Sequence, residues 1–282
     1  MPVQIVTDST ATLPPDVAAA HGIHVIPLHV RFGSRDYRAG VDLTADQFFE
    51  MLAASPLHPS TSQPNPTEFE TLYSEVTRQG DPVVSIHISE VLSGTIASAR
   101  QAVQALPNRQ IHIVNSETAS MPLGLIAVEA AKAARAGADA PTIVRLVEGL
   151  KPRTKVAFVV ATLEYLRRGG RIGGAQAFLG GLLSVKPVLH IHGGRVDPVT
   201  RVRTFAKAHE AIGAYVREHA PRGVDHGAII HARAEEQRAA LAALVQARYA
   251  PTGDTYADIT IDPVVGTYTG PGAFGFAFVA RA

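Results

Sequence analysis

"VVSIHISEVLSGTIASARQAVQAL", residues 83–106, has the pattern of a strand, a loop and a helix in immediate succession. Its first six residues form a largely apolar run of strand length, its middle is a hydroxyl-rich loop with one glycine, and its end is alanine-rich. The same unit occurs twice more, in the stretches that begin at Val3 and at Ile111. Three such units in one chain predict a doubly wound parallel sheet, which is a Rossmann-like α/β domain.

The pattern changes after "KVAFVVATL", which begins at Lys155. Two long alanine-rich helices separate five further expected strands, around Val188, Arg195, Gly227, Tyr256 and Phe274. This order predicts a second α/β domain with a mixed or antiparallel sheet. We therefore expect an amino-terminal domain over residues 1–160 and a carboxy-terminal domain over residues 161–282. An insertion over residues 32–66 holds a hairpin around "GSRDYRAG", the helix "ADQFFEMLAA" and the proline-rich loop "STSQPNP".

Composition excludes several classes of function. The chain has 26 basic and 25 acidic residues among 282, so no field of one sign would attract nucleic acid or an anionic membrane. The absence of cysteine excludes disulfides, thiolate metal sites and a cysteine nucleophile. The chain start has no signal-peptide pattern, and the longest uncharged apolar stretch, 264–280, is shorter than the ~20 residues of a membrane span. We expect a cytoplasmic protein without a transmembrane segment.

Hydroxyl side chains fill the loops after the first three strands, where a doubly wound sheet binds its ligands. They are Thr7, Ser9 and Thr10 beside Asp8, then Ser89, Ser93 and Thr95, then Ser116, Thr118 and Ser120. Each of them could equally be a helix N-cap. The "SGT" at 93–95 is more informative, because its glycine lets a ligand approach backbone N–H groups at a helix start. Such a loop can hold a carboxylate or a phosphate without a cation.

Two basic motifs have both a functional and a structural interpretation. "LRRGGRIGG", 166–174, lacks the spacing of a dinucleotide fingerprint and follows a helix-like segment, so a glycine-broken helix end is the alternative. "TRVRTFAKA", 200–208, puts Arg201, Arg203 and Lys207 near the start of a helix, where their charge opposes the helix dipole. An anionic partner would explain this basic cluster, and so would a solvated helix face.

The glycine-rich segment "VGTYTGPGAFG", 265–275, is expected to connect two apolar strands, either as a long hairpin or as backbone that approaches a ligand closely. A hydrolase would need a base near Ser93, and His87 or His231 is conceivable, but no G-x-S-x-G motif is present. The pair His190 and His192 has no evident third ligand, so we expect no metal site.

Six motifs occur in an order and spacing that resemble the DegV family of bacterial fatty-acid-binding proteins. They are "TDSTATLP", "TSQPNP", "SGTIASA", "LRRGGRIGG", "RVRTFAKA" and "GTYTGPGAFG", and the resemblance runs from Val3 to Ala280. It implies two α/β domains with a long-chain fatty acid, such as palmitate or oleate, in a buried tunnel between them. No further cofactor is implied.

The resemblance also implies which residues hold the carboxylate. They are Thr61 of "TSQP" and Ser93 of "SGT", supported by loop residues Ser62, Gly94, Thr95 and Gly266. Tyr268 stands where the family motif commonly has histidine. A phenol still donates a hydrogen bond but cannot become cationic, so charge balance must come from Arg171 or from dipoles.

The family role implies a carrier that is not catalytic alone and that presents its fatty acid to a separate ATP-dependent kinase protein. In agreement, the chain has no Walker motif. We expect Arg171, Arg201 and Arg203, which lie in the two basic motifs, to face the kinase or the transferred phosphate. The alternatives are a hydrolase that uses the Ser93 loop, or a protein of the same fold that binds a different carboxylate.

Overall fold

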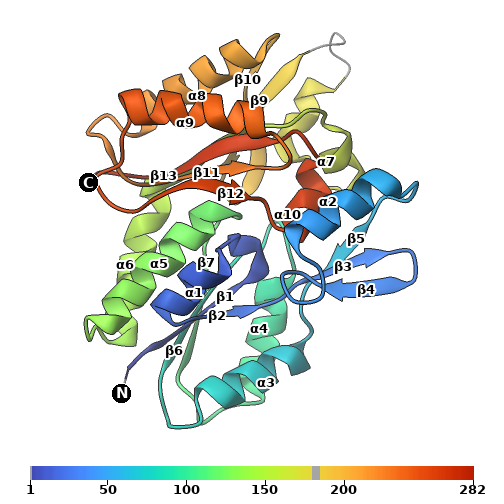
Figure 1. Ribbon diagram of the computed structural model, residues 1–282. Helices are drawn as coiled ribbons and strands as arrows, with labels where there is room; N and C mark the ends of the chain where they lie inside the picture. Colours follow the sequence, from blue (N-terminus) through green and yellow to red (C-terminus); the bar gives the residue numbers. More distant parts are fainter. Residues whose placement is uncertain (1, 180–184) are drawn as a thin grey trace.

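The computed structural model describes residues 2–179 and 185–282 (Figure 1). The strands are β1 (Gln4–Asp8), β2 (Ile23–Ile26), β3 (His29–Phe32), β4 (Arg35–Arg38), β5 (Ser60–Ser62), β6 (Val83–His87), β7 (Ile111–Asn115), β8 (Thr154–Val159), β9 (Lys186–His192), β10 (Arg195–Val202), β11 (Val224–His231), β12 (Thr255–Thr260) and β13 (Phe274–Ala280). The α-helices are α1 (Pro15–His21), α2 (Ala45–Ala54), α3 (Pro66–Val76), α4 (Thr95–Gln104), α5 (Met121–Arg135), α6 (Ala140–Leu150), α7 (Glu164–Arg168), α8 (Phe205–His219), α9 (Glu235–Arg248) and α10 (Pro263–Thr269). Short 3-10 turns are η1 (Ser9–Ala11), η2 (Lys151–Arg153) and η3 (Gly173–Phe178).

The first sheet is parallel, with strand order β2-β1-β6-β7, which confirms the doubly wound prediction. Alternation along β1 separates its two faces, because Val6 packs with α3 and α4 while Ile5 packs with α5 and α6. Both faces are covered, as parallel sheets require.

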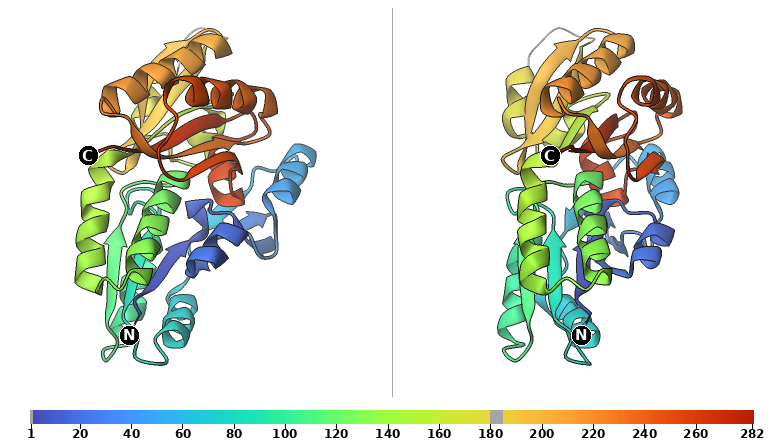
Figure 2. Two further views of the ribbon diagram at one scale, coloured as in Figure 1. Left: turned by 60° about the vertical axis from the view of Figure 1, so that its left-hand side comes forward. Right: turned by 90° about the vertical axis from the view of Figure 1, so that its left-hand side faces the viewer.

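The second sheet is mixed, as predicted, with order β10-β9-β8-β13-β11-β12, and among its pairings only β11 with β12 is parallel. Its outer face packs with α8 and α9. The views of Figure 2 place this yellow-to-red half above the blue-to-green half. β8 lies before the expected boundary at residue 160, yet it pairs in this second sheet. The domain limits 1–160 and 161–282 remain a prediction.

The insertion forms a small antiparallel sheet of order β4-β3-β5. The expected hairpin and the expected helix α2 are both present. "STSQPNP" differs from the expected loop, because its first three residues are the edge strand β5. Its last residues start α3, where Asn65 is the N-cap and accepts a hydrogen bond from Glu68 N.

The expectation of a loop or hairpin between strands at 265–275 is wrong, because residues 263–269 form helix α10. The Asp262 carboxyl caps this helix by accepting from the N–H groups of Val264 and Val265, and Pro263 is compatible with its first turn. Gly270, at φ +68°, ends the helix before β13. Across residues 2–179 and 185–282, no helix combines the length and apolarity that crossing a bilayer demands.

Candidate functional site

The candidate site lies at the point of the first sheet where the strand order reverses. In the order β2-β1-β6-β7 the connections leave in opposite directions from β1 and β6, so the loops after these two strands diverge. Ligands of open α/β sheets bind at this position, outside the carboxyl ends of the strands. Thr10 follows β1, whereas Leu92 and Ser93 follow β6, and all three line the pockets described next.

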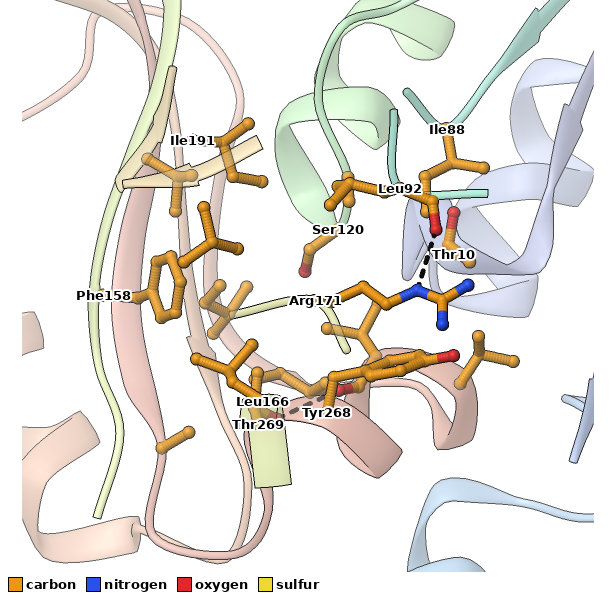
Figure 3. Close-up of a pocket in the computed structure, with 18 of the residues that line it drawn as sticks. Thr10, Ile88, Leu92, Ser120, Phe158, Leu166, Arg171, Ile191, Tyr268 and Thr269 are labelled. Atoms are coloured by element: carbon orange, nitrogen blue, oxygen red, sulfur yellow. Dashed lines mark hydrogen bonds between the residues drawn. The ribbon is translucent and has the colours of Figure 1, made fainter. Parts of the chain in front are cut away.

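An apolar cavity extends from these loops to the inner face of the second sheet (Figure 3). Its volume is about 80 Å³. Its walls are Thr10, Ile88, Leu92, Ala119, Ser120, Val156, Phe158, Leu166, Arg171, Ile191, Val196, Ile230, Ile261, Val264, Val265, Tyr268, Thr269, Ala273 and Phe274. Both sheets contribute, since Ile88 follows β6 whereas Phe158 and Ile230 lie on β8 and β11.

A smaller polar pocket of about 30 Å³ adjoins the apolar cavity. It is lined by Leu28, Thr61, Ser62, Gln63, Ile88, Leu92, Ser93, Arg171, Val264 and Tyr268. Five of these residues also line the apolar cavity: Ile88, Leu92, Arg171, Val264 and Tyr268. The two spaces are therefore neighbours that share walls, one apolar and one polar.

Two hydroxyl pairs contribute Thr61, Tyr268 and Ser93 to the polar pocket, whereas Thr95, the partner of Ser93, lines neither space. Thr61 Oγ1 on β5 is hydrogen-bonded to Tyr268 Oη on α10, and Ser93 Oγ lies 2.9 Å from Thr95 Oγ1 at the start of α4. Each pair carries two protons and uses one of them in its internal hydrogen bond. Each pair therefore keeps one proton that it can donate to a ligand.

Arg171 adds a positive charge at the junction of the two spaces. Its Nε donates to the carbonyl of Leu92 at 3.1 Å, and its Nη1 donates to that of Gly169 at 2.8 Å. The guanidinium carbon lies 5.1 Å from the ring centroid of Tyr268. Within the described part of the chain, no carboxylate forms an ion pair with Arg171. Two spare hydroxyl donors beside an unneutralised guanidinium suit an anionic head group.

A buried hydrogen-bond network orients Thr10 in the apolar cavity. Thr10 Oγ1 donates to Asp8 Oδ1, and Asp8 Oδ2 accepts from Ile88 N at 3.0 Å and lies 2.9 Å from His87 Nδ1. His87 Nε2 is in turn 2.7 Å from Ser85 Oγ. Ser85 is fully buried, so this Asp-His-Ser order cannot present a nucleophile to substrate. The network fixes the loop after β1.

Some expected site residues lie elsewhere. A Cβ on Gly266 would come within 2.8 Å of Phe48 Cε1, so this glycine allows α10 to pack against α2 and lines neither space. Gly94 makes room for the side chain of Gln63, which does line the polar pocket. Arg201 and Arg203 line neither space, and the Arg201 guanidinium carbon lies 4.9 Å from the ring centroid of Phe178.

The helix-dipole interpretation of the second basic motif needs correction. α8 begins at Phe205 after its N-cap Thr204, so Arg201 lies on β10 and Arg203 precedes the helix. Only Lys207 of the three is in the first turn, and its Nζ is 2.8 Å from Glu210 Oε2. Unfavourable charge at the start of α8 therefore gives no support for an anionic partner at this motif.

The structure gives no support to the catalytic alternative. Ser93 has a threonine hydroxyl as its side-chain partner, whereas His87 is bonded to Asp8 and His231 Nε2 to Asp258 Oδ1 at 2.9 Å. In residues 2–179 and 185–282 the one cluster with metal-ligand geometry is Glu129, His226 and Asp254. Lys132 Nζ already bonds to both carboxylates of that cluster, so its charge occupies the place of a cation.

Sequence reasoning singled out Thr10 and Ser120 as strand-end hydroxyls without assigning them to the site, yet both line the apolar cavity. Gln63 and Thr269 were missed as lining residues, although both lie inside quoted motifs. The walls from the second sheet, such as Phe158 and Ile230, have no distinguishing signal, because they follow the same pattern as ordinary core residues.

A family model, related sequences and solved structures all match this chain to the same family. Residues 2–281 match the family described as "Uncharacterised protein, DegV family". A DegV domain-containing protein of Deinococcus radiodurans is 42% identical over 98% of each chain, and Protein DegV of Bacillus subtilis is 36% identical over 99% of each. Among solved structures, a DegV family protein of Thermus thermophilus described by its fatty acid binding has a TM-score of 0.94, at 36% identity over 100% of both chains. DegV of Bacillus subtilis, described as a fatty acid binding protein, has a TM-score of 0.91, at 35% identity over 100% of both chains. The chain therefore belongs to the DegV family.

Proposed function

We propose that this protein binds one long-chain fatty acid, with its carboxylate in the polar pocket and its acyl chain in the apolar cavity. The observation that carries the proposal is that the two spaces adjoin and share five wall residues. Thr61, Ser93 and Tyr268 supply neutral donors, and Arg171 supplies the positive charge. The fatty acid binding described for the relatives from Thermus thermophilus and Bacillus subtilis agrees with this assignment.

The energetic contributions of the two spaces differ. Burial of each methylene contributes about 0.8 kcal/mol, so ~15 methylenes contribute about 12 kcal/mol before the ordering costs of binding. A neutral hydrogen bond contributes only about 1 kcal/mol net. The apolar cavity therefore supplies most of the affinity, whereas the polar pocket decides which end of the ligand enters it.

Solvent extraction of purified protein, followed by mass spectrometry, should find fatty acid near one mole per mole. Thr61→Ala combined with Ser93→Ala removes one hydroxyl from each donor pair, and we expect palmitate to bind about tenfold to a hundredfold more weakly. Ser98→Ala is the matched control, because Ser98 is buried in α4 and lines neither space. Full palmitate affinity in the double variant would refute the carboxylate assignment, and an empty protein that binds no added palmitate would refute the ligand class.

We further propose that the protein is a cytoplasmic carrier, not catalytic alone, that presents its fatty acid to a separate ATP-dependent fatty acid kinase. Arg201 and Arg203 support a role at a partner surface, because no carboxylate of the described residues forms an ion pair with either one. The step is tested by adding a purified kinase and ATP to the loaded protein and following acyl phosphate. No product without the kinase, and product with it, is the expected result.

A further inference from the structure

Apart from Arg171 and Tyr268, which also line the polar pocket, three polar residues line the apolar cavity: Thr10, Ser120 and Thr269. Each residue is more than nine-tenths buried. Figure 3 shows the Ser120 hydroxyl directed into the cavity. An alkyl chain that covers such hydroxyls leaves their oxygens without the hydrogen bonds they would make in water.

The protein accepts the proton of each of these hydroxyls. Thr10 Oγ1 donates to Asp8 Oδ1, and Thr269 Oγ1 donates to the carbonyl of Val265 at 3.2 Å. Neither hydroxyl retains a proton for a ligand. Both can present only oxygen lone pairs to the cavity.

The Ser120 hydroxyl can also give its proton to a protein group, the hydroxyl of Thr12. The two hydroxyl oxygens are 3.3 Å apart, and Thr12 Oγ1 is 2.9 Å from Asp262 Oδ2 and 3.3 Å from the Thr10 carbonyl. Whether Asp262 is a carboxylate or a carboxylic acid, the Thr12 proton has an acceptor other than Ser120. Thr12 can therefore accept the Ser120 proton, and in that arrangement the Ser120 lone pairs face the cavity.

Helix capping does not account for Ser120. The residue is the N-cap of α5, but its side chain makes no capping hydrogen bond. Its backbone has φ +60° and ψ −153°, a region that L-residues rarely adopt. A strained residue whose hydroxyl bypasses its own helix and points into an apolar cavity suggests a role toward the ligand.

We propose that Ser120, with Thr10 beside the polar end, makes the cavity selective for acyl chains that carry a hydroxyl group. The inference rests on the proposed function and specifies its substrate class. The two ends of the site differ in hydrogen-bonding character. The polar pocket, with Arg171 and Tyr268 on the wall it shares with the cavity, offers protons to a carboxylate, whereas Thr10, Ser120 and Thr269 offer acceptors in the cavity. A chain hydroxyl can donate to such an acceptor, but a chain ketone cannot.

The test measures displacement of a fluorescent fatty acid by stearate, by its monohydroxy positional isomers and by the corresponding oxo acids. At the best position we expect the hydroxy acid to bind about tenfold more tightly than the oxo acid at the same carbon. Ser120→Ala should reduce this ratio to about one, whereas the buried-serine control Ser98→Ala should leave it unchanged. Ser120→Gly removes the same hydroxyl and suits the positive φ, so it serves if the alanine variant folds poorly.

The outcomes separate the two levels of the proposal. If stearate binds but no position distinguishes hydroxy from oxo acid, or if the ratio survives in both Ser120 variants, the hydroxyl selectivity is wrong and the fatty acid site stands. If none of these acids displaces the probe and none binds directly, the proposed function itself is wrong.

Discussion

At the scale of single residues, the geometry of the polar pocket depends on a glycine, Gly169. Gly169 follows α7 and faces the Tyr268 ring, and a Cβ at this position would overlap Cδ1 and Cε1 of that ring. The close approach lets the Tyr268 hydroxyl reach Thr61 while its ring lies beside the Arg171 guanidinium. A glycine in the first basic motif therefore has a packing reason at the site, not merely at a helix end.

Gly169→Ala should displace the Tyr268 ring and break its hydrogen bond with Thr61. We expect palmitate affinity to fall about tenfold, as for the loss of one or two hydrogen bonds, in a displacement assay. Gly149→Ala is the control, because a Cβ there meets no atom within 4 Å and the residue is exposed on α6. That variant should keep its affinity and gain about 1 kcal/mol in the free energy of unfolding. Undiminished affinity in Gly169→Ala would mean that Tyr268 does not hold the ligand.

At the scale of elements, α10 is the piece that the sequence did not reveal. Glycines and threonines in 265–275 favour loops in isolation, but burial of the helix against α2 and α7 overrides that local preference. Its cap, Asp262, is buried, and this burial raises the pKa of the carboxyl to about 7, because it outweighs the lowering by the hydrogen bonds from Thr12 and the helix N–H groups. The nearby Asp8 charge acts in the same direction as burial.

The raised pKa of Asp262 predicts a pH-dependent stability. The folded state retains this proton above the ordinary pKa of 3.8, so its contribution is full below pH 3.8 and is lost as the pH rises through about 7. Asp262→Asn keeps an oxygen for the cap and an N–H group for Thr12 without a charge. Its free energy of unfolding, measured with urea at each pH, should therefore increase relative to that of the wild type between pH 4 and pH 8. The difference should grow by up to about 4 kcal/mol. An equal difference at both pH values would contradict a buried charge at Asp262.

The elements that were predictable are those with a local signal. The strand-loop-helix units of the first sheet carry apolar runs and hydroxyl caps, and the hairpin of β3 and β4 carries its turn glycine. Thr61 and Ser93 were predicted from the family resemblance, and in the structure both residues line the polar pocket. The cavity walls from β8 and β11 were not predictable, because a residue such as Ile230 faces a cavity or a core according to the packing of distant segments.

At the scale of the whole molecule, the two sheets share one core. α5 contacts β1 and β6 of the first sheet and β8, β11 and β13 of the second. The continuous apolar cluster around it includes Ile86 of the first sheet and Ile230 of the second. A Cβ on Gly124 would meet the Ala11 carbonyl oxygen at 2.7 Å, so α5 also lies close against the loop after β1. The candidate site therefore lies between two halves that are already packed together.

This shared core predicts cooperative unfolding. Ile212 lies on α8, in the outer cluster of the second sheet, far along the chain from the first sheet. Ile212→Ala should cost about 2–5 kcal/mol through the cavity it leaves, and the loss should be equal in both halves because neither sheet keeps its inner face covered alone. Hydrogen exchange in increasing urea measures β6 and β13 separately in one experiment. Equal losses in the two strands are the expected result. A loss confined to β13 would show that the sheets unfold independently, in which case the fatty acid would join two separate domains instead of entering one cooperative core.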